Sequence, residues 1–252
     1  MTKRVLTREV LLEEFVAVEN QALTEEEFDL LSDTVKAAMV LSAPPKPLQE
    51  VGSKQRVLEK TEENIVRVEW TVWLLHQLLK SYLRKAGKPN RQITAKVIQE
   101  EGYLLILNGE TEQLPMMVEV TLQTGWPATN IILLDCGKRG AANTKTQFEA
   151  FNKIPYMFNG AHDLRQIIDH WRILVVTTWY HVPRVRRTAA AARKHAQYKL
   201  PVIGVPRKVC SFPTAEKVEG EIERILTYAE KDDIRPFPRK QEFTSKTKHC
   251  HH

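Results

Sequence analysis

Short apolar blocks alternate with amphipathic segments along most of this chain. Five blocks hold aliphatic and β-branched residues without the period-two alternation of a half-exposed strand, at 37–41, 103–107, 130–135, 173–176 and 200–205. Blocks of this kind are typical of strands that are covered on both faces of a parallel sheet. We therefore predict five strands. The last one is expected near a side of the sheet, because Pro201 lacks a backbone donor.

Helical periodicity fills most of the intervals between these blocks. Apolar residues recur at helical spacing within 8–20, 24–31, 63–85, 110–124, 143–153, 164–170, 182–196 and 214–231. Alternating strands and helices predict an α/β protein, a three-layer Rossmann-like domain with a mostly parallel five-stranded sheet and helices on both faces. Residues 48–62, 87–101 and 154–163 are expected to be connections. The first is a loop at the ligand edge of the sheet, and the last is a loop that could cover a pocket.

The pattern divides the chain into three regions. Residues 1–35 form an expected N-terminal helical extension, whose two helices can be capped by Thr7 and Thr24. Residues 36–232 form the α/β domain. Residues 233–252 form a polar, basic tail that we expect to be disordered.

Residues 172–184 contain the clearest local transition in the sequence. The apolar run from Ile173 to Val176 ends in two threonines, and Pro183 then fits the first turn of a helix. His181 and Arg184 are therefore expected between the carboxyl end of a buried strand and the start of a helix. Open α/β sheets bind ligands at that position, and free backbone N–H groups there favour anions.

These residues also carry a resemblance to a known family. Leu-Val-Val-Thr-Thr-x-Tyr-His-x-Pro-Arg, ending at Arg184, is similar to the "LVTSxYHMxR" signature of the SanA/ElyC/YdcF family, a largely uncharacterised bacterial group. Leu-Asn-Gly-Glu-Thr-Glu at 107–112 resembles the family's "SGG…E" junction, Asn143-Thr144 its "NT" pair, and Arg67 an arginine after its first strand. These matches span about residues 36–206. The chain departs from the family at 42–47, where prolines replace a glycine-rich turn, and at Thr146-Gln147, where the family has Glu-Asn.

Right-handed crossovers place every loop that follows the carboxyl end of a strand on one edge of the sheet. The residues expected there are Ser42, Asn108, Gly109, Glu112, Lys138, Arg139, Asn143, Thr144, Thr177, Tyr180, His181 and Arg184. His181 is the candidate acid or base, since its charge changes near neutral pH. Glu112 is the candidate carboxylate, which orients the histidine, anchors a ligand hydroxyl or binds a metal.

Two arginines are the candidate anion-binding groups. Arg184 and Arg67 would hold phosphate or carboxylate oxygens through bidentate contacts. The resemblance adds Gly109, Asn143, Thr144, Thr177 and Tyr180 as ligand-binding positions. Structural readings stay open at three positions. Arg67 fits an ordinary salt-bridged arginine in the first turn of its helix, Glu112 fits an acid that favours the helix dipole, and Asn143 fits a helix cap.

Composition limits the classes of function. The chain has 252 residues, 42% of them hydrophobic, which suits one large domain. The net charge is +6, but residues 235–252 hold five basic residues and one acidic residue, so +4 belongs to the tail and +2 to the rest. We therefore do not expect nucleic acid as a partner.

Cysteine and hydrophobic patterns indicate the compartment. Three scattered cysteines favour a reducing compartment over a disulfide framework. No apolar run approaches the length of a membrane span, and acids interrupt the N-terminal segment where a signal peptide would be apolar. We expect a cytoplasmic protein without the membrane anchor of the family's envelope members. The closing His249-Cys-His-His252 lacks a second cluster, so no metal site is expected.

The resulting functional expectation is a domain that binds a small anionic ligand. The ligand class is a phosphorylated or nucleotide-like molecule, and the resemblance adds S-adenosylmethionine as a candidate. The domain would hydrolyse the ligand, transfer a group on it, or only bind it, because no P-loop, GxGxxG, nucleophile elbow or HExxH motif indicates one reaction. The alternative is a non-catalytic regulator of cell-envelope homeostasis, since anchored family members are associated with peptidoglycan and lipid-carrier metabolism.

Overall fold

The computed structural model describes residues 5–43, 53–138, 143–152, 172–191, 200–210 and 215–237. Its five strands are β1 (Val35–Leu41), β2 (Leu104–Gly109), β3 (Ile131–Asp135), β4 (Arg172–Thr178) and β5 (Val202–Val205). All four neighbouring pairs are parallel, in the order β3-β2-β1-β4-β5. The predicted α/β class is confirmed, and the fifth strand lies at an edge as Pro201 indicated.

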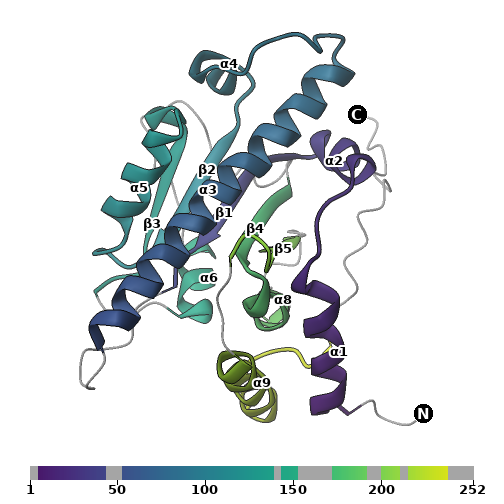
Figure 1. Cartoon of the computed structure of the whole chain (residues 1–252), viewed down its shortest axis with the longest axis vertical. Helices are drawn as coiled ribbons and strands as arrows, with labels where there is room; N and C mark the ends of the chain where they lie inside the picture. Colours follow the sequence, from purple (N-terminus) through teal and green to yellow (C-terminus); the bar gives the residue numbers. More distant parts are fainter. Residues whose placement is uncertain are drawn as a thin grey trace.

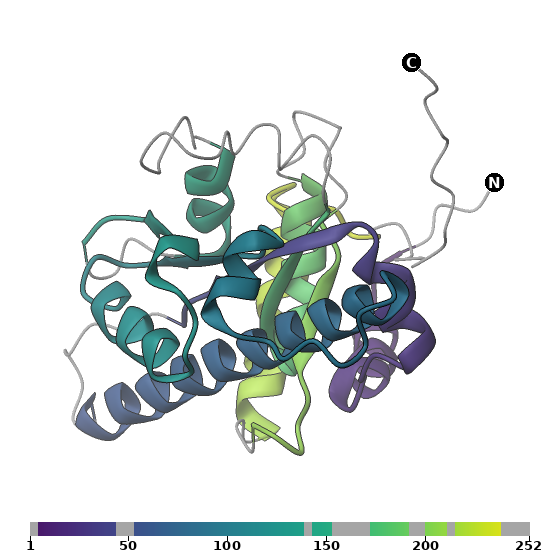
Figure 2. The ribbon, with the colours of Figure 1, turned by 90° about the horizontal axis from the view of Figure 1, so that it is seen from above.

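The helices cover both faces of this sheet (Figures 1 and 2). The helices and 3-10 turns between and around the strands are α1 (Arg8–Glu19), α2 (Glu25–Ser32), α3 (Ser53–Lys85), α4 (Ala95–Glu100), α5 (Leu114–Gln123), η1 (Ala128–Asn130), α6 (Thr144–Asn152), η2 (Trp179–His181), α8 (Val182–Ala191) and α9 (Ala215–Glu230). The long helix α3 runs diagonally across one face, and α6 and α8 lie behind the sheet in Figure 1.

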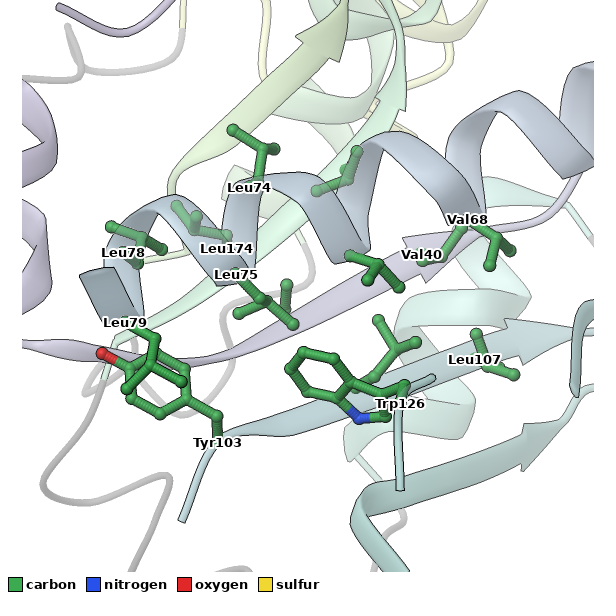
Figure 3. Close-up of a cluster of buried hydrophobic side chains, with 14 of the residues drawn as sticks. Val40, Val68, Leu74, Leu75, Leu78, Leu79, Tyr103, Leu107, Trp126 and Leu174 are labelled. Carbon is green, nitrogen blue, oxygen red and sulfur yellow. The ribbon is translucent and has the colours of Figure 1, made fainter. Parts of the chain in front are cut away.

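Two apolar layers hold the helices to the sheet. On one face Val40, Leu107 and Leu174 meet side chains of α3 and α5 (Figure 3), and on the other Met39, Ile106 and Val175 meet side chains of α6 and α8. Alternate residues of each central strand therefore enter opposite layers. Both layers are buried, which is why these strands are apolar throughout their length.

The strand order creates a switch point between β1 and β4. The chain leaves β1 toward β2 on one side, whereas the later strands β4 and β5 lie on the other side of β1. Loops after β1 and β4 therefore diverge at the carboxyl ends of these strands. Ligands of open α/β proteins bind in the crevice at such a point.

The helical extension packs directly on the α/β unit. The capping box of Thr24 and Glu27 starts α2, and the Thr7 hydroxyl accepts from the N–H of Val10 at the start of α1. Leu11 and Phe15 of α1 join a third apolar cluster with η2 and α9. Glu14 adds a 2.7 Å ion pair with Arg187 of α8.

Two predicted connections contain helices. Residues 53–62 are helical rather than a loop, so α3 begins at Ser53 and Arg67 lies well inside it rather than in its first turn. The connection 87–101 contains the short helix α4, which the Thr94 hydroxyl caps. The predicted helix 164–170, the loop 154–163, Arg139 and most of the tail lie outside the described residues.

Candidate functional site

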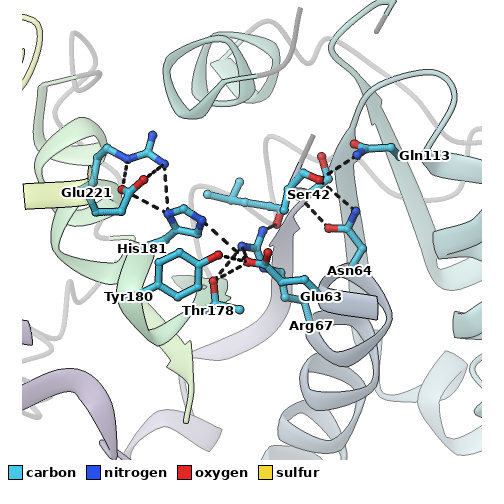
Figure 4. A network of polar contacts seen from close by, with 12 residues as sticks. Ser42, Glu63, Asn64, Arg67, Gln113, Thr178, Tyr180, His181 and Glu221 are labelled. Carbon is cyan, nitrogen blue, oxygen red and sulfur yellow. Dashed lines mark hydrogen bonds and ion pairs between the residues drawn. The ribbon is translucent and has the colours of Figure 1, made fainter. Parts of the chain in front are cut away.

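Arg67 of α3 reaches the carboxyl ends of β1 and β4 (Figure 4). Its Nη1 donates to the Leu41 carbonyl over 2.6 Å, and its Nη2 donates to the Thr178 hydroxyl over 2.8 Å. The same Nη2 forms an ion pair with Glu63, one turn earlier on α3. Both side chains are buried, 1% and 2% exposed. One guanidinium thus joins a helix and two strands at the switch point.

Glu63 is the centre of this first pair. Its Oε1 accepts hydrogen bonds from the Thr178 hydroxyl at 2.9 Å and from the Tyr180 hydroxyl at 2.8 Å, in addition to Arg67. Thr178 faces α3 because it continues the alternation of Leu174 and Val176, which point to that side of β4. Burial, and then the Glu63 carboxylate, raise the pKa of Tyr180, so its hydroxyl stays a donor.

A second buried pair joins α8 to α9. Arg184 donates from Nε to Oε2 of Glu221 over 2.6 Å and from Nη1 to the Thr144 hydroxyl over 2.7 Å. Arg224 also pairs with Glu221. Burial alone would raise the pKa of Glu221, but the adjacent Arg184 outweighs it and holds this pKa well below the ordinary value. Both partners are therefore charged at neutral pH.

His181 lies between the two pairs. Its Nε2 is 3.8 Å from Oε1 of Glu63, and its Nδ1 is 3.1 Å from Nη2 of Arg184 and 3.3 Å from Oε2 of Glu221. The ring rests on that of Tyr180, with centroids 4.1 Å apart. Burial lowers the pKa of His181 to about 4 despite the opposing effect of Glu221. The imidazole is consequently neutral near pH 7.

The neutral ring has two tautomers, and each has a partner at Nδ1. When Nδ1 accepts from Arg184, Nε2 carries the proton and acts as a donor. When Nδ1–H donates to Glu221, Nε2 presents a lone pair. The ring can therefore give or take a proton at Nε2. The Glu63 oxygen facing Nε2 already accepts several hydrogen bonds, so it is better suited to positioning than to proton transfer.

Side-chain amides occupy the neighbouring ends of β1 and β2. Asn64 accepts from the Ala43 N–H at 2.7 Å, and Gln113 donates to the Ala43 carbonyl at 3.0 Å. Gln147 donates to the carbonyls of Ser42 and Asn108 at 3.2 and 3.1 Å. The backbone donor that a glycine-rich turn would offer to a phosphate is already used at Ala43. Residues 44–52, which include Pro44, Pro45 and Pro47, lie outside the described residues.

The network contains five of the predicted site residues, namely Arg67, Thr144, Tyr180, His181 and Arg184. Thr177 is buried next to it, one position before Thr178 and thus on the opposite face of β4. Gly109 ends β2 beside Ser42. Asn143 is exposed and caps α6, where its Oδ1 accepts from the Thr146 N–H at 3.0 Å.

Glu112 is not part of this network. It is exposed in the turn before α5, which begins at Leu114 rather than at Glu110. The carboxylates beside His181 are instead Glu63 and Glu221, which sequence reasoning did not single out. Both carried a signal, because Glu63 precedes Arg67 by four positions and Glu221 interrupts the apolar stripe of Val218, Ile222 and Ile225.

The side chains in the two ion pairs and the histidine differ in their exposure to solvent. His181 and Arg184 keep 11% and 14% of their side-chain surface exposed, whereas Glu63, Arg67 and Glu221 keep 1–2%. No group of three or more metal-binding side chains with the geometry of an ion site occurs among the described residues. Within the same residues no helix has the length and apolarity of a bilayer span.

Comparisons with protein-family models, with curated proteins and with solved structures gave no match.

Proposed function

We propose that this chain binds a small phosphorylated or nucleotide-like molecule at the carboxyl edge of its sheet, between β1 and β4. The proposal rests on the convergence of two buried arginine–carboxylate pairs and a neutral histidine at the switch point. Buried ion pairs contribute little net stability because desolvation offsets their attraction. Their concentration at the position where α/β sheets bind ligands therefore supports a functional role.

His181 and Arg184 make the contacts to the ligand in this proposal. Both lie where β4 ends and α8 begins, and both keep some exposed surface. Arg184 supplies the positive charge that an anionic oxygen needs, and His181 supplies a proton donor or acceptor at Nε2. If the ligand reacts, His181 is the group that moves the proton. Nucleotides and S-adenosylmethionine are the first candidates to test.

A thermal-shift screen tests the proposal. ATP, AMP, S-adenosylmethionine, glucose 6-phosphate and inorganic pyrophosphate would each be added at increasing concentrations. A ligand at 100 times its Kd stabilises by about 2.7 kcal/mol, which is about 5 to 10 °C for a chain of this size. His181→Gln and Arg184→Gln should abolish the shift that the wild-type protein shows, each measured against the variant's own baseline Tm.

Arg207→Gln is the matched control for these variants. Arg207 follows β5, is 58% exposed and pairs with Glu19 of α1, and its guanidinium lies over the ring of Trp179 at 6.0 Å from the centroid rather than beside His181. Its replacement removes the same charge and should leave the ligand-induced shift intact. The proposal fails if none of these ligands shifts the Tm, or if the shift survives in both His181→Gln and Arg184→Gln.

A further inference from the structure

Glu221 is a buried carboxylate surrounded by cationic and polar donors. Arg184 of α8 contacts it through Nε at 2.6 Å and through Nη2 at 3.5 Å. Arg224 pairs with it from the next turn of α9, and Nδ1 of His181 lies 3.3 Å from its Oε2. Glu221 itself is 1% exposed. An internal anion thus sits where three side chains with N–H donors meet.

This geometry is also the way in which arginine binds a free anion. A guanidinium presents Nε and one terminal nitrogen as a fork, and carboxylate and phosphate oxygens both fit that fork. The other terminal nitrogen of Arg184 donates to Thr144 at 2.7 Å, which fixes the plane of the guanidinium. An external anion can therefore reach the fork of Arg184 if it takes the place of the Glu221 carboxylate.

We infer that Glu221 is an internal substitute for the anionic group of the ligand, and that a phosphate-bearing ligand binds by displacing Glu221 from Arg184. This inference rests on the proposed function and specifies how its site is opened. With the Glu221 side chain turned away, Arg184 and Arg224 would lose their shared counter-ion. The fork of Arg184 would then be open to two oxygens of a phosphoryl group, so the ligand would be held from α8.

The placement of α9 allows this exchange without disturbing the sheet. The buried apolar side chains of α9 adjacent to Glu221, Ile222 and Ile225, pack with α1 and η2. They do not belong to the two clusters that hold helices against the strands. The Glu221 side chain can therefore rotate, or α9 can shift slightly, without moving Arg184. The packing of α8 and the hydrogen bond to Thr144 keep Arg184 in place.

Isothermal titration calorimetry with inorganic pyrophosphate tests the inference on the full chain. Glu221→Gln keeps the shape of the side chain and an oxygen acceptor for Arg184 but removes the competing charge. We expect this variant to bind pyrophosphate on the order of tenfold more tightly than the wild-type protein, a change of about 1.4 kcal/mol. Glu223→Gln is the control, because Glu223 is exposed on the same helix and its replacement changes the net charge equally. Its affinity should equal that of the wild type.

The outcomes separate the inference from the function on which it rests. Weaker binding by Glu221→Gln, with binding by the wild type intact, would mean that Glu221 positions Arg184, so the inference fails and the site stands. No heat of binding in the wild type and in both variants would overturn the inference, whereas the proposed function stands or falls with the five-ligand screen. Equal tightening by Glu223→Gln would assign the effect to net charge and also overturn the inference.

A second measurement does not depend on the stability of a variant. Amide hydrogen exchange of the wild-type protein would be followed in 215–230 with and without saturating pyrophosphate. Displacement of Glu221 removes an ion pair that ties α9 to α8, so exchange in α9 should become faster while α8 becomes protected. Increased protection of α9 would show that the helix is held more firmly by the ligand and would contradict the inference.

Discussion

Arg67 of α3 donates a 2.8 Å hydrogen bond to the hydroxyl of Thr178, at the carboxyl end of β4. The same guanidinium donates to the carbonyl of Leu41 at the end of β1. β1 and β4 are the two strands on either side of the switch point. The ends of these strands are therefore held by a polar clamp from α3, and the position of the candidate site depends on it.

Removal of this clamp should be costly. Arg67→Met leaves the buried Glu63 without its counter-ion, and breaking one side of a buried pair typically costs about 3 to 5 kcal/mol. Urea unfolding of the variant and the wild type would measure the loss. Arg84→Met is the matched control, because Arg84 lies on the same helix as Arg67, is 50% exposed and pairs with Asp29 of α2. It should cost less than about 1 kcal/mol.

A double variant distinguishes the buried charge from the lost packing. Arg67→Met combined with Glu63→Gln removes both charges, so part of the stability lost in Arg67→Met should return. If the double variant is as unstable as the sum of the two single variants, the two charges are not coupled. That result would contradict the ion pair as the main interaction of the clamp.

The sheet was predictable from the sequence because its strands are buried on both faces. Runs such as Ile173–Val176 can be recognised without knowledge of their neighbours, since a strand covered by helices must be apolar throughout. Parallel pairing then fixes which loops share an edge. Thr144 could be placed beside His181 and Arg184 on that basis, although it is far from them along the chain.

The partners of these residues could not be predicted in the same way. Glu221 comes from a helix beyond the last strand, and the sequence does not show which neighbour its carboxylate meets. The first turns of α3 were predicted as a loop for a related reason. Residues 53–62 are mostly good helix formers, but they lack the apolar stripe by which helices were assigned.

Gly109→Ala should destabilise the protein through a direct overlap. A Cβ at Gly109 would lie 2.8 Å from Oγ and 2.9 Å from Cβ of Ser42, across the ends of β1 and β2. Overpacking of this kind typically costs about 1 to 3 kcal/mol. Chemical denaturation would measure the loss, and Ser42→Gly in the same chain should recover much of it because it removes both atoms.

Gly220→Ala provides the comparison for this substitution. Gly220 lies in α9, and a Cβ added there would meet no described atom within 4 Å beyond its chain neighbours and the backbone of its own helix. Alanine is favoured over glycine in a helix by roughly 0.5 to 1 kcal/mol, so this variant should be slightly more stable than the wild type. Equal losses from Gly109→Ala and Gly220→Ala would rule out the contact with Ser42 as the cause.

Helix α1 should be needed for the stability of the candidate site. Phe15 is 3% exposed and packs with Trp179 and Tyr180 of η2 and with α9. Phe15→Ala should therefore cost about 3 to 5 kcal/mol. Val16 is 73% exposed on the same helix, so Val16→Ala should change stability by less than about 0.5 kcal/mol. Comparable losses in the two variants would contradict the docking of α1 seen here.

The pH dependence of stability should reveal the neutral His181. Burial lowers the pKa of His181 from 6.5 to about 4, against the opposing effect of Glu221. Below about pH 6.5 the unfolded chain binds a proton that the folded chain does not. The free energy of unfolding should therefore fall by on the order of 3 kcal/mol as the pH decreases from 6.5 to 4, and it should change little above that window. Glu221, whose pKa is also lowered, acts in the same direction at lower pH.

Urea unfolding at pH 7.5, 6.0 and 5.0 would test this dependence. His181→Gln cannot bind the proton in either state, so the loss between pH 7.5 and 5.0 should be smaller than in the wild type. Burial also lowers the pKa of His76, a half-buried histidine of α3 whose ring lies against Trp126, and His76→Gln therefore reports the contribution of a second histidine. If the wild-type protein instead became more stable on acidification, the Glu221 carboxylate would have to raise the pKa of His181 enough to keep the folded imidazole protonated. In that case the proton donor at Nε2 would be an imidazolium, and the acid–base role assigned to the neutral ring would be wrong.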